Sequence, residues 1–287
     1  MLFNKRSRSL HSSKQLQKKR KKNIVLASVI STCIIILLIL FVLILRLNFL
    51  QISSIEVKGA TTFNSGELEQ RVLALLSNDA YLYVIPKSNS LLYPKSVLEK
   101  NLTDSYKKID SLEISHKNLK TLAINIVEKN PSALVCEGFH EEIDQDENCF
   151  FADSTGYVFA KAPQFSNGVY IRYYITTDIG DSIIGTSFID KNLFNSLQKF
   201  AETAQKAFIQ PLGILIGTQG DYEMYSKNSD DSEMTTYFND RNPFEKTASN
   251  LVAFWNDSKI KKKGATTVPI FDSINLRFGN NVFYVIK

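Results

Sequence analysis

The sequence predicts an α+β protein carried on one N-terminal transmembrane helix. An uncharged apolar run occupies residues 24–45, helical and strand spacings alternate over residues 50–130, and short strands with two helical segments fill residues 131–287. The chain has 287 residues, of which 44% are hydrophobic. This is enough to bury the cores of two modest domains beyond the apolar run.

The run from Ile24 to Leu45 is predicted to span a bilayer. Its twenty-two uncharged residues would reach about 33 Å as a helix, slightly more than a hydrocarbon layer of ~30 Å. A cleaved signal peptide is the alternative, but it would have a shorter apolar core and a small-x-small cleavage site, and neither is present. Residues 1–22 hold nine basic residues and no acidic one. The positive-inside rule therefore predicts a cytoplasmic tail at 1–23, a transmembrane helix at 24–46 and export of the rest.

The net charge of +5 arises from the N-terminal tail. Without its nine basic residues, 25 of the 34 Lys and Arg remain against 29 Asp and Glu, a net charge of −4. We expect the tail to attract anionic lipids of the plasma membrane. Nucleic-acid binding would require aromatic residues among the bases or a folded motif, and the tail has neither.

Residues 50–130 are predicted to form one domain with the order strand, helix, helix, strand, strand. Asn64 and Glu67 form a capping-box-like helix start, and Pro94 opens the second helix at its first turn. The polar residues His116–Asn118 are expected to form the turn between the last two strands. The predicted elements are strand 52–59, helix 64–77, the helix from Pro94 through Leu102, and strands 109–114 and 122–127.

Residues 131–287 are predicted to form a mixed, strand-rich domain with two helices. Asp153–Gly156 is expected to be a turn whose glycine takes a positive φ. Near the end, alternating apolar residues flank a turn at Gly279–Asn281, which predicts a hairpin. The predicted strands are 133–136, 149–152, 157–159, 169–175, 212–216, 222–225, 234–238, 274–278 and 282–286, and the helices are 187–208 and one opened by Pro243.

Cys136 and Cys149 flank an acidic polar stretch at 137–148, for which three interpretations remain open. An oxidising exterior favours a disulfide, worth about 3 kcal/mol in the loop-entropy model. The alternatives are two free thiols, or a metal site formed by both cysteines and His140. The spacing matches no zinc pattern, so the sequence predicts no metal.

The sequence offers little for catalysis. It contains no nucleophile elbow, no zinc-protease helix and no phosphate-binding glycine loop. His116 and His140 are expected to be solvated, and the acidic stretch lacks the positional pattern of a calcium loop. We therefore expect neither an enzyme nor a cofactor. A membrane-anchored cysteine-dependent enzyme, of transpeptidase type and using Cys136 or Cys149, stays as the alternative.

The order strand, helix, helix, strand, strand directly outside a single anchor resembles a POTRA domain. Ile55–Gly59 and Glu128–Ala133 look like the corresponding places in the FtsQ/DivIB family of bacterial cell-division proteins. The hairpin around Asp153–Gly156 resembles one in the β domain of that family, and Ser273–Tyr284 is similar to its terminal hairpin. The resemblance covers residues 5–287 in architecture and four short patches in motif. The acidic stretch at 137–148 and the segment Asn228–Glu233 depart from the pattern.

This resemblance implies a POTRA domain at 50–130, an FtsQ-like β domain at 131–287, and a non-enzymatic scaffold at the division septum. A sheet that ends with its last strand presents unpaired N–H and C=O groups, on which a partner can add a strand. The implied partners are coiled-coil division proteins of the FtsB/DivIC and FtsL types. A POTRA secretion chaperone is a further alternative. The residues expected to bind the partner are Arg277, Phe278, Val282, Phe283 and Tyr284. Strand alternation predicts that Arg277 faces solvent.

Overall fold

The structure is a computed structural model with mixed α and β elements. It describes residues 13–287 except position 63 and the ranges 78–79, 139–147, 165–167, 177–179, 207–208, 258–259 and 261–268. The chain divides into two compact units. One comprises Met1–Leu102 with Leu112–Ile126, and the other comprises Thr103–Ser111 with Val127–Lys287.

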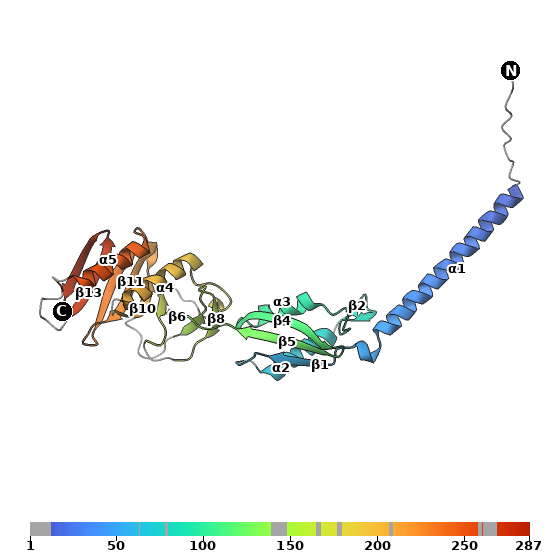
Figure 1. Ribbon diagram of the computed structural model, residues 1–287, viewed down its shortest axis with the longest axis horizontal. Coiled ribbons are helices and arrows are strands. Elements are labelled where there is room, and N and C mark those ends of the chain that lie inside the picture. The colour runs from blue at the N-terminus through green and yellow to red at the C-terminus, as the bar shows by residue number, and fades with distance from the viewer. Residues whose placement is uncertain are drawn as a thin grey trace, which may run out of the picture. The chain divides into compact units, whose positions relative to one another are not determined.

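Helix α1 (Ser13–Leu45) contains the apolar run, and it is the dark blue helix of Figure 1. Its segment Gln17–Leu45 has a mean hydropathy of 3.2 and is the one helix in the described part of the chain that is long and apolar enough to cross a membrane. The side chains from Lys18 onward are almost all exposed. Helical structure therefore begins before Ile24, inside the basic tail, and ends at Leu45, one residue before the predicted end of the transmembrane helix.

The first unit is built on a three-stranded sheet with the order β1-β5-β4, in which β1 and β5 are parallel. The expected order of one strand, two helices and two strands is present. A short hairpin, β2–β3, lies between the helices, where the sequence analysis predicted no strand. The elements are β1 (Ser54–Lys58), α2 (Ser65–Ser77), β2 (Ala80–Tyr81), β3 (Ile85–Pro86), α3 (Lys95–Ser105), β4 (Ile109–Asn118) and β5 (Thr121–Glu128).

Helix α2 packs on this sheet through an apolar stripe. Leu68, Val72 and Leu76 recur every four residues and are buried, as expected for one face of an amphipathic helix. Gly59 ends β1 at φ +80°, and a side chain there would collide with the carbonyl oxygen of Ile126. Only glycine fits this close approach without strain.

The position of His116 differs from the prediction. The residue lies within β4, not in a turn, and the turn falls at Leu119 and Lys120. Its Nε2 is 2.7 Å from the carbonyl oxygen of Ser90, and its ring meets that of Tyr93 edge-on at 5.0 Å. The polar residues looked like a turn because β4 is an edge strand, where polar side chains are common.

The second unit is built on a nine-stranded mixed sheet with the order β14-β13-β12-β11-β10-β9-β6-β7-β8. Its strands are β6 (Ala133–Glu137), β7 (Cys149–Ala152), β8 (Val158–Lys161), β9 (Arg172–Ile175), β10 (Gln210–Ile216), β11 (Asp221–Lys227), β12 (Glu233–Asn239), β13 (Phe271–Phe278) and β14 (Asn281–Ile286). Two helices, α4 (Lys191–Lys206) and α5 (Phe244–Asn256), each connect a pair of parallel neighbouring strands.

Helices α4 and α5 cover the same face of the sheet (Figure 1). The core between these layers is aromatic, and the rings of Phe200 on α4 and Phe238 on β12 stack at 4.1 Å. On α5, Leu251 and Trp255 are buried one turn apart. This packing fixes β12 and β13 under α5 and leaves β14 as the last strand of the sheet.

Candidate partner-binding edge

The terminal hairpin β13–β14 forms for local reasons. Ile274 and Leu276 point into the core, and their neighbours on β13 do not, which is the two-residue alternation of a half-buried strand. The chain reverses through Gly279 at φ +68°, a conformation open to glycine. Asn250 on α5 donates a hydrogen bond of 2.8 Å from its side-chain amide to the carbonyl oxygen of Gly279. The turn is thus fixed to the helix layer.

Strand β14 is an open edge as far as the described residues go, since none of them forms a strand on its outer side. It pairs with β13 on one side and is the terminal strand in the sheet order. The N–H group of Lys287 donates inward to Ile270 at 3.0 Å. Because successive residues of a strand point their N–H groups to alternate sides, those of Ile286, Tyr284 and Val282 point outward. Another extended chain could pair with them.

The side chains of β14 divide between two faces of the sheet. Tyr284 lies on the helix side, where its ring centroid is 5.2 Å from that of Phe254 and 5.8 Å from that of Phe271. Phe283 and Val285 lie on the other face of the sheet, and they pair with Asn275 and Ser273 of β13, respectively. Both are more than half exposed. The open edge is therefore bordered by apolar side chains on the face that the helices leave bare.

The structure brings the five predicted residues together on this hairpin, in two environments. Phe278 and Phe283 are exposed, each at 57%, and their rings meet edge-on at 5.2 Å. Val282 packs against the core, and Tyr284 is partly covered by α5. Arg277, expected to face solvent, is half-buried. Its guanidinium lies 5.2 Å from the ring of Tyr237, and its Nε donates to Asn275.

Sequence reasoning missed three residues of this surface. Val285 and Ile286 are exposed on the same strand, and the alternation that predicted the strand already extended to them. Tyr237 lies on β12, opposite Asn275 in the parallel β12–β13 pairing. No local signal could have found it, since α5 separates the two strands in the chain.

The segment Asn228–Glu233, for which the resemblance gave no counterpart, supports this hairpin. Asn228 is buried. Its amide nitrogen donates to the carbonyl oxygen of Phe271 at 2.8 Å, and its Oδ1 accepts the N–H group of Phe271 at 3.0 Å. The two bonds hold the first residue of β13 in place. The same loop carries the carbonyl oxygen of Glu233, to which the Lys287 ammonium donates.

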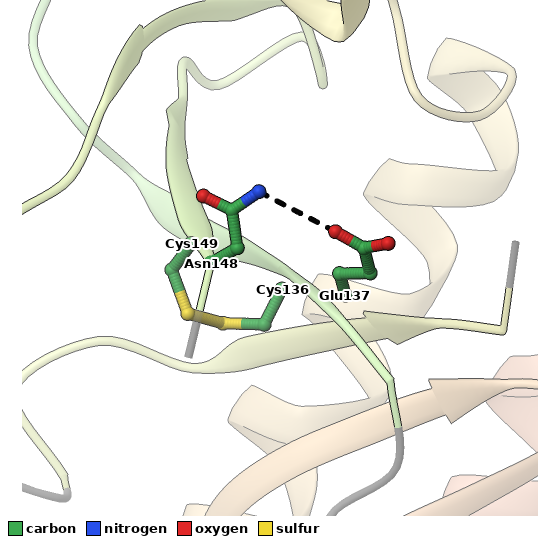
Figure 2. Close-up of a disulfide and its surroundings, with 4 residues drawn as sticks. All are labelled: Cys136, Glu137, Asn148 and Cys149. Atoms are coloured by element: carbon green, nitrogen blue, oxygen red, sulfur yellow. Dashed lines mark hydrogen bonds between the residues drawn. A yellow bond between two sulfur atoms is a disulfide. The ribbon is translucent and has the colours of Figure 1, made fainter. Parts of the chain in front are cut away.

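Cys136 and Cys149 are joined in a disulfide between directly opposed residues of β6 and β7 (Figure 2). Beside it, the side-chain amide of Asn148 donates to the Glu137 carboxylate at 3.4 Å. Positions 139–147, including His140 and most of the acidic stretch, lie outside the described residues. Within the described residues, no group of three His, Cys, Asp or Glu side chains could hold a metal ion.

A scan against models of protein families finds none that matches this chain, and a search of curated proteins finds no match.

Proposed function

We propose that this chain is a bitopic membrane scaffold of the bacterial division machinery, with its N-terminus in the cytoplasm and a POTRA domain followed by an FtsQ-like domain outside. Partner division proteins of the FtsB/DivIC and FtsL coiled-coil types bind at the β14 edge. The complex links these partners to cell-wall synthesis at the septum. The role is one of binding, without catalysis.

The observation that carries this proposal is the open edge of β14, with Phe283 and Val285 exposed beside it. Strand addition supplies main-chain hydrogen bonds, and alternate side chains supply specificity. Anchoring is supported by α1, which is long and apolar enough to cross a membrane. The resemblance of Ile55–Gly59, Glu128–Ala133 and Ser273–Tyr284 to the FtsQ/DivIB family supplies the identity of the partners.

The disulfide weighs against a cysteine-dependent exported enzyme. All three cysteines of the chain are described, and the one outside the disulfide, Cys33, lies in α1. Thiol catalysis requires a thiolate, and neither Cys136 nor Cys149 can supply one while they are bonded to each other.

The test uses the full chain in lipid nanodiscs, titrated with the extracytoplasmic segment of the FtsB/DivIC-type protein from the same organism. Phe283→Glu should weaken binding at least about tenfold, since a charge replaces an apolar contact beside the edge. Val169→Glu is the matched control, because Val169 is 56% exposed in the same unit and lies outside the hairpin. Equal binding by Phe283→Glu and the unsubstituted chain would refute the proposed edge.

A cellular measurement tests the division role separately. Depletion of the chain should leave cells growing as undivided filaments, and expression of the Val169→Glu chain should restore septa. Expression of Phe283→Glu at the same level should not. Normal division after depletion would refute the role in division even if the coiled-coil segment binds in vitro.

A further inference from the structure

The first unit exposes a cluster of large apolar side chains around the end of α1. These residues lie in the connector after the helix, in the β2–β3 turn and in the turn that follows. We call them the anchor-side cluster: Leu47, Phe49, Leu82, Tyr83, Leu91 and Leu92. Leu82 and Tyr83 are 89% and 95% exposed. Large apolar side chains that are exposed close together often mark an interaction site.

Hydrogen bonds from residues next to the cluster hold its neighbouring segments at the end of α1. The carbonyl oxygen of Leu45, the last residue of the helix, accepts bonds from the side-chain amides of Gln51 at 2.8 Å and Asn89 at 2.7 Å. Asn89 is fully buried. The N–H group of Ser90 donates to Leu50 at 2.7 Å. Residues 89–90 are therefore held against the point where the chain leaves the helix.

The β2–β3 turn cannot lie far from that point. Tyr83 precedes Asn89 by six residues, which span at most about 20 Å when fully extended. Ala80 pairs with Pro86 and Tyr81 with Ile85, so the strand segment folds back and the reach is shorter. The hairpin lies beside the C-terminal end of α1, as these bonds require (Figure 1).

Both the backbone conformation and the side-chain exposure of the β2–β3 turn are energetically unfavourable in water. The N–H group of Val84 donates to Tyr81 at 3.0 Å, and the two residues between them have positive φ, 50° for Leu82 and 60° for Tyr83. Such a turn normally carries Asn-Gly, because residues with a Cβ are strained there by about 1 kcal/mol or more. Here a leucine and a tyrosine occupy it and hold their side chains almost fully exposed. The turn therefore has both a strained backbone and exposed apolar side chains. Burial of these side chains in an apolar layer would contribute favourable free energy that offsets both costs.

We propose that the β2–β3 turn and the rest of the anchor-side cluster insert into the interfacial layer of the bilayer that α1 crosses. The inference rests on the proposed anchoring of α1. Lipid is the occupant because the helix end held by Asn89 is the place where the chain enters the membrane. Tyrosine favours the membrane interface, where its ring is buried and its hydroxyl stays hydrated. The unit is then held against the lipid surface at a second place besides the helix.

The test places a fluorescent reporter in the turn of the full chain. Tyr83→Trp replaces one aromatic ring by another, and the chain's one natural tryptophan, Trp255, is buried and gives a constant background. The chain is incorporated into nanodiscs of phosphatidylglycerol and phosphatidylcholine whose acyl chains carry bromine near the carbonyl end. Leu82→Trp is a second reporter in case the first variant does not fold.

Val127→Trp is the matched control. Val127 is 55% exposed and lies on β5, six residues beyond Thr121, which pairs with the first residue of β1. At about 3.3 Å per residue it is ~20 Å further along the strand from the start of β1. The turn reporter should lose roughly half of its added emission to the brominated lipid, with a blue shift, because an interfacial group reaches ~5–10 Å into the acyl boundary. The control should lose none.

Three outcomes are informative. Quenching at Tyr83→Trp without quenching at Val127→Trp supports the proposal. Emission from the turn that is unquenched and at the wavelength of an exposed indole overturns it. Blue-shifted but unquenched emission would mean that protein covers the turn, for instance a second copy of this chain, and it also overturns the proposal. Failure of α1 to span the bilayer is detected separately, as a chain that does not float with the lipid.

Discussion

The two edge strands of the nine-stranded sheet, β8 and β14, differ in whether other residues of the chain bond their outer side. At one edge, which we call the closed edge, the chain's own segment bonds the first residue of β8: the N–H group of Val158 donates to Thr186 at 2.8 Å, and that of Gly185 donates back to Val158 at 2.8 Å. Val158 is fully buried. At the other edge, β14 has an apolar and mostly exposed surface. Edge strands invite unwanted pairing and are usually protected, so an unprotected edge in the same sheet as a protected one supports the proposed binding role.

The largest expected effect is at the closed edge. Val158→Pro removes the N–H group that bonds Thr186 and leaves that carbonyl oxygen without its donor, in addition to disturbing a fully buried side chain. The second unit should lose about 4 kcal/mol of unfolding free energy. The measurement is urea unfolding of the full chain in detergent micelles, followed by the fluorescence of Trp255, which lies in the core of that unit. A loss below about 1 kcal/mol would mean that the segment at 183–186 does not protect this edge.

The next effect concerns the disulfide, which ties together β6 and β7 near the closed edge. Opening the Cys136–Cys149 bond, by reduction or by the double change Cys136→Ser and Cys149→Ser, should lower the unfolding free energy by about 3 kcal/mol, the loop-entropy value for this separation. The same urea measurement applies, and Cys33→Ser is the control. Binding of the coiled-coil segment at β14 should be unchanged. Loss of that binding on reduction would show that the two edges are energetically coupled.

A smaller effect is expected at the turn between β7 and β8. The Asp153 carboxylate, 11% exposed, lies 2.8 Å from the Lys129 ammonium and accepts bonds from the N–H and hydroxyl groups of Thr155. Burial works to raise the pKa of Asp153, but the bonds to Lys129 and Thr155 outweigh it and lower the pKa below its ordinary 3.8. Asp153→Asn should cost about 2 kcal/mol at neutral pH. Asp110→Asn removes a carboxylate 3.2 Å from the same ammonium, but this one is 56% exposed, so it should cost less than about 0.5 kcal/mol.

The pH dependence of this pair has a definite sign. A carboxyl group with a lowered pKa stabilises the fold fully above its ordinary value and loses this contribution as the pH falls through the lowered one. The unsubstituted chain should therefore lose stability below pH 3.8, and the difference from Asp153→Asn should disappear there. For Lys129, burial opposes a charged ammonium, but the bonds to Asp153 and Asp110 raise its pKa above 10.5. That contribution is present below pH 10.5 and is lost as the pH rises through the raised value. A pH-independent difference would mean that the charge of Asp153 does not stabilise the fold.

Local patterns predicted the open edge, because everything that specifies a hairpin lies within a few residues. Alternation at Ile274 and Leu276, with glycine at 279, was sufficient to place β13 and β14. The apolar run was equally plain, since hydropathy alone identifies a candidate membrane helix. The positive φ expected at Gly156 is also present, at 81°.

What sequence reasoning missed depended on distant contacts or on unusual turn residues. The β2–β3 hairpin escaped because Leu82 and Tyr83 are not turn formers. Tyr237 was missed because α5 lies between β12 and β13 in the chain, so Tyr237 and its partner Asn275 are far apart in the sequence. Asn228 was placed in a loop for which the resemblance gave no counterpart, yet its side chain bonds both backbone groups of Phe271, forty-three residues away.

The smallest effect on stability should be at the open edge. Ile286→Pro removes an N–H group that points away from β13, and proline is tolerated on the free side of an edge strand. The side chain of Ile286 is 53% exposed, so the urea transition should move by less than about 0.5 kcal/mol. Binding of the coiled-coil segment should nevertheless fall sharply, because an added strand needs that donor and would meet the proline ring.

The neighbouring position supplies the contrast. Val285→Pro removes an N–H group directed at β13, so it should destabilise the hairpin itself by about 1–3 kcal/mol. The same change to proline is thus made at three kinds of N–H group. The group bonds the covering segment at Val158, bonds β13 at Val285, and points to the open side at Ile286. If Ile286→Pro cost as much stability as Val285→Pro, the outer N–H groups of β14 would already be bonded within the chain, and strand addition at this edge would be ruled out.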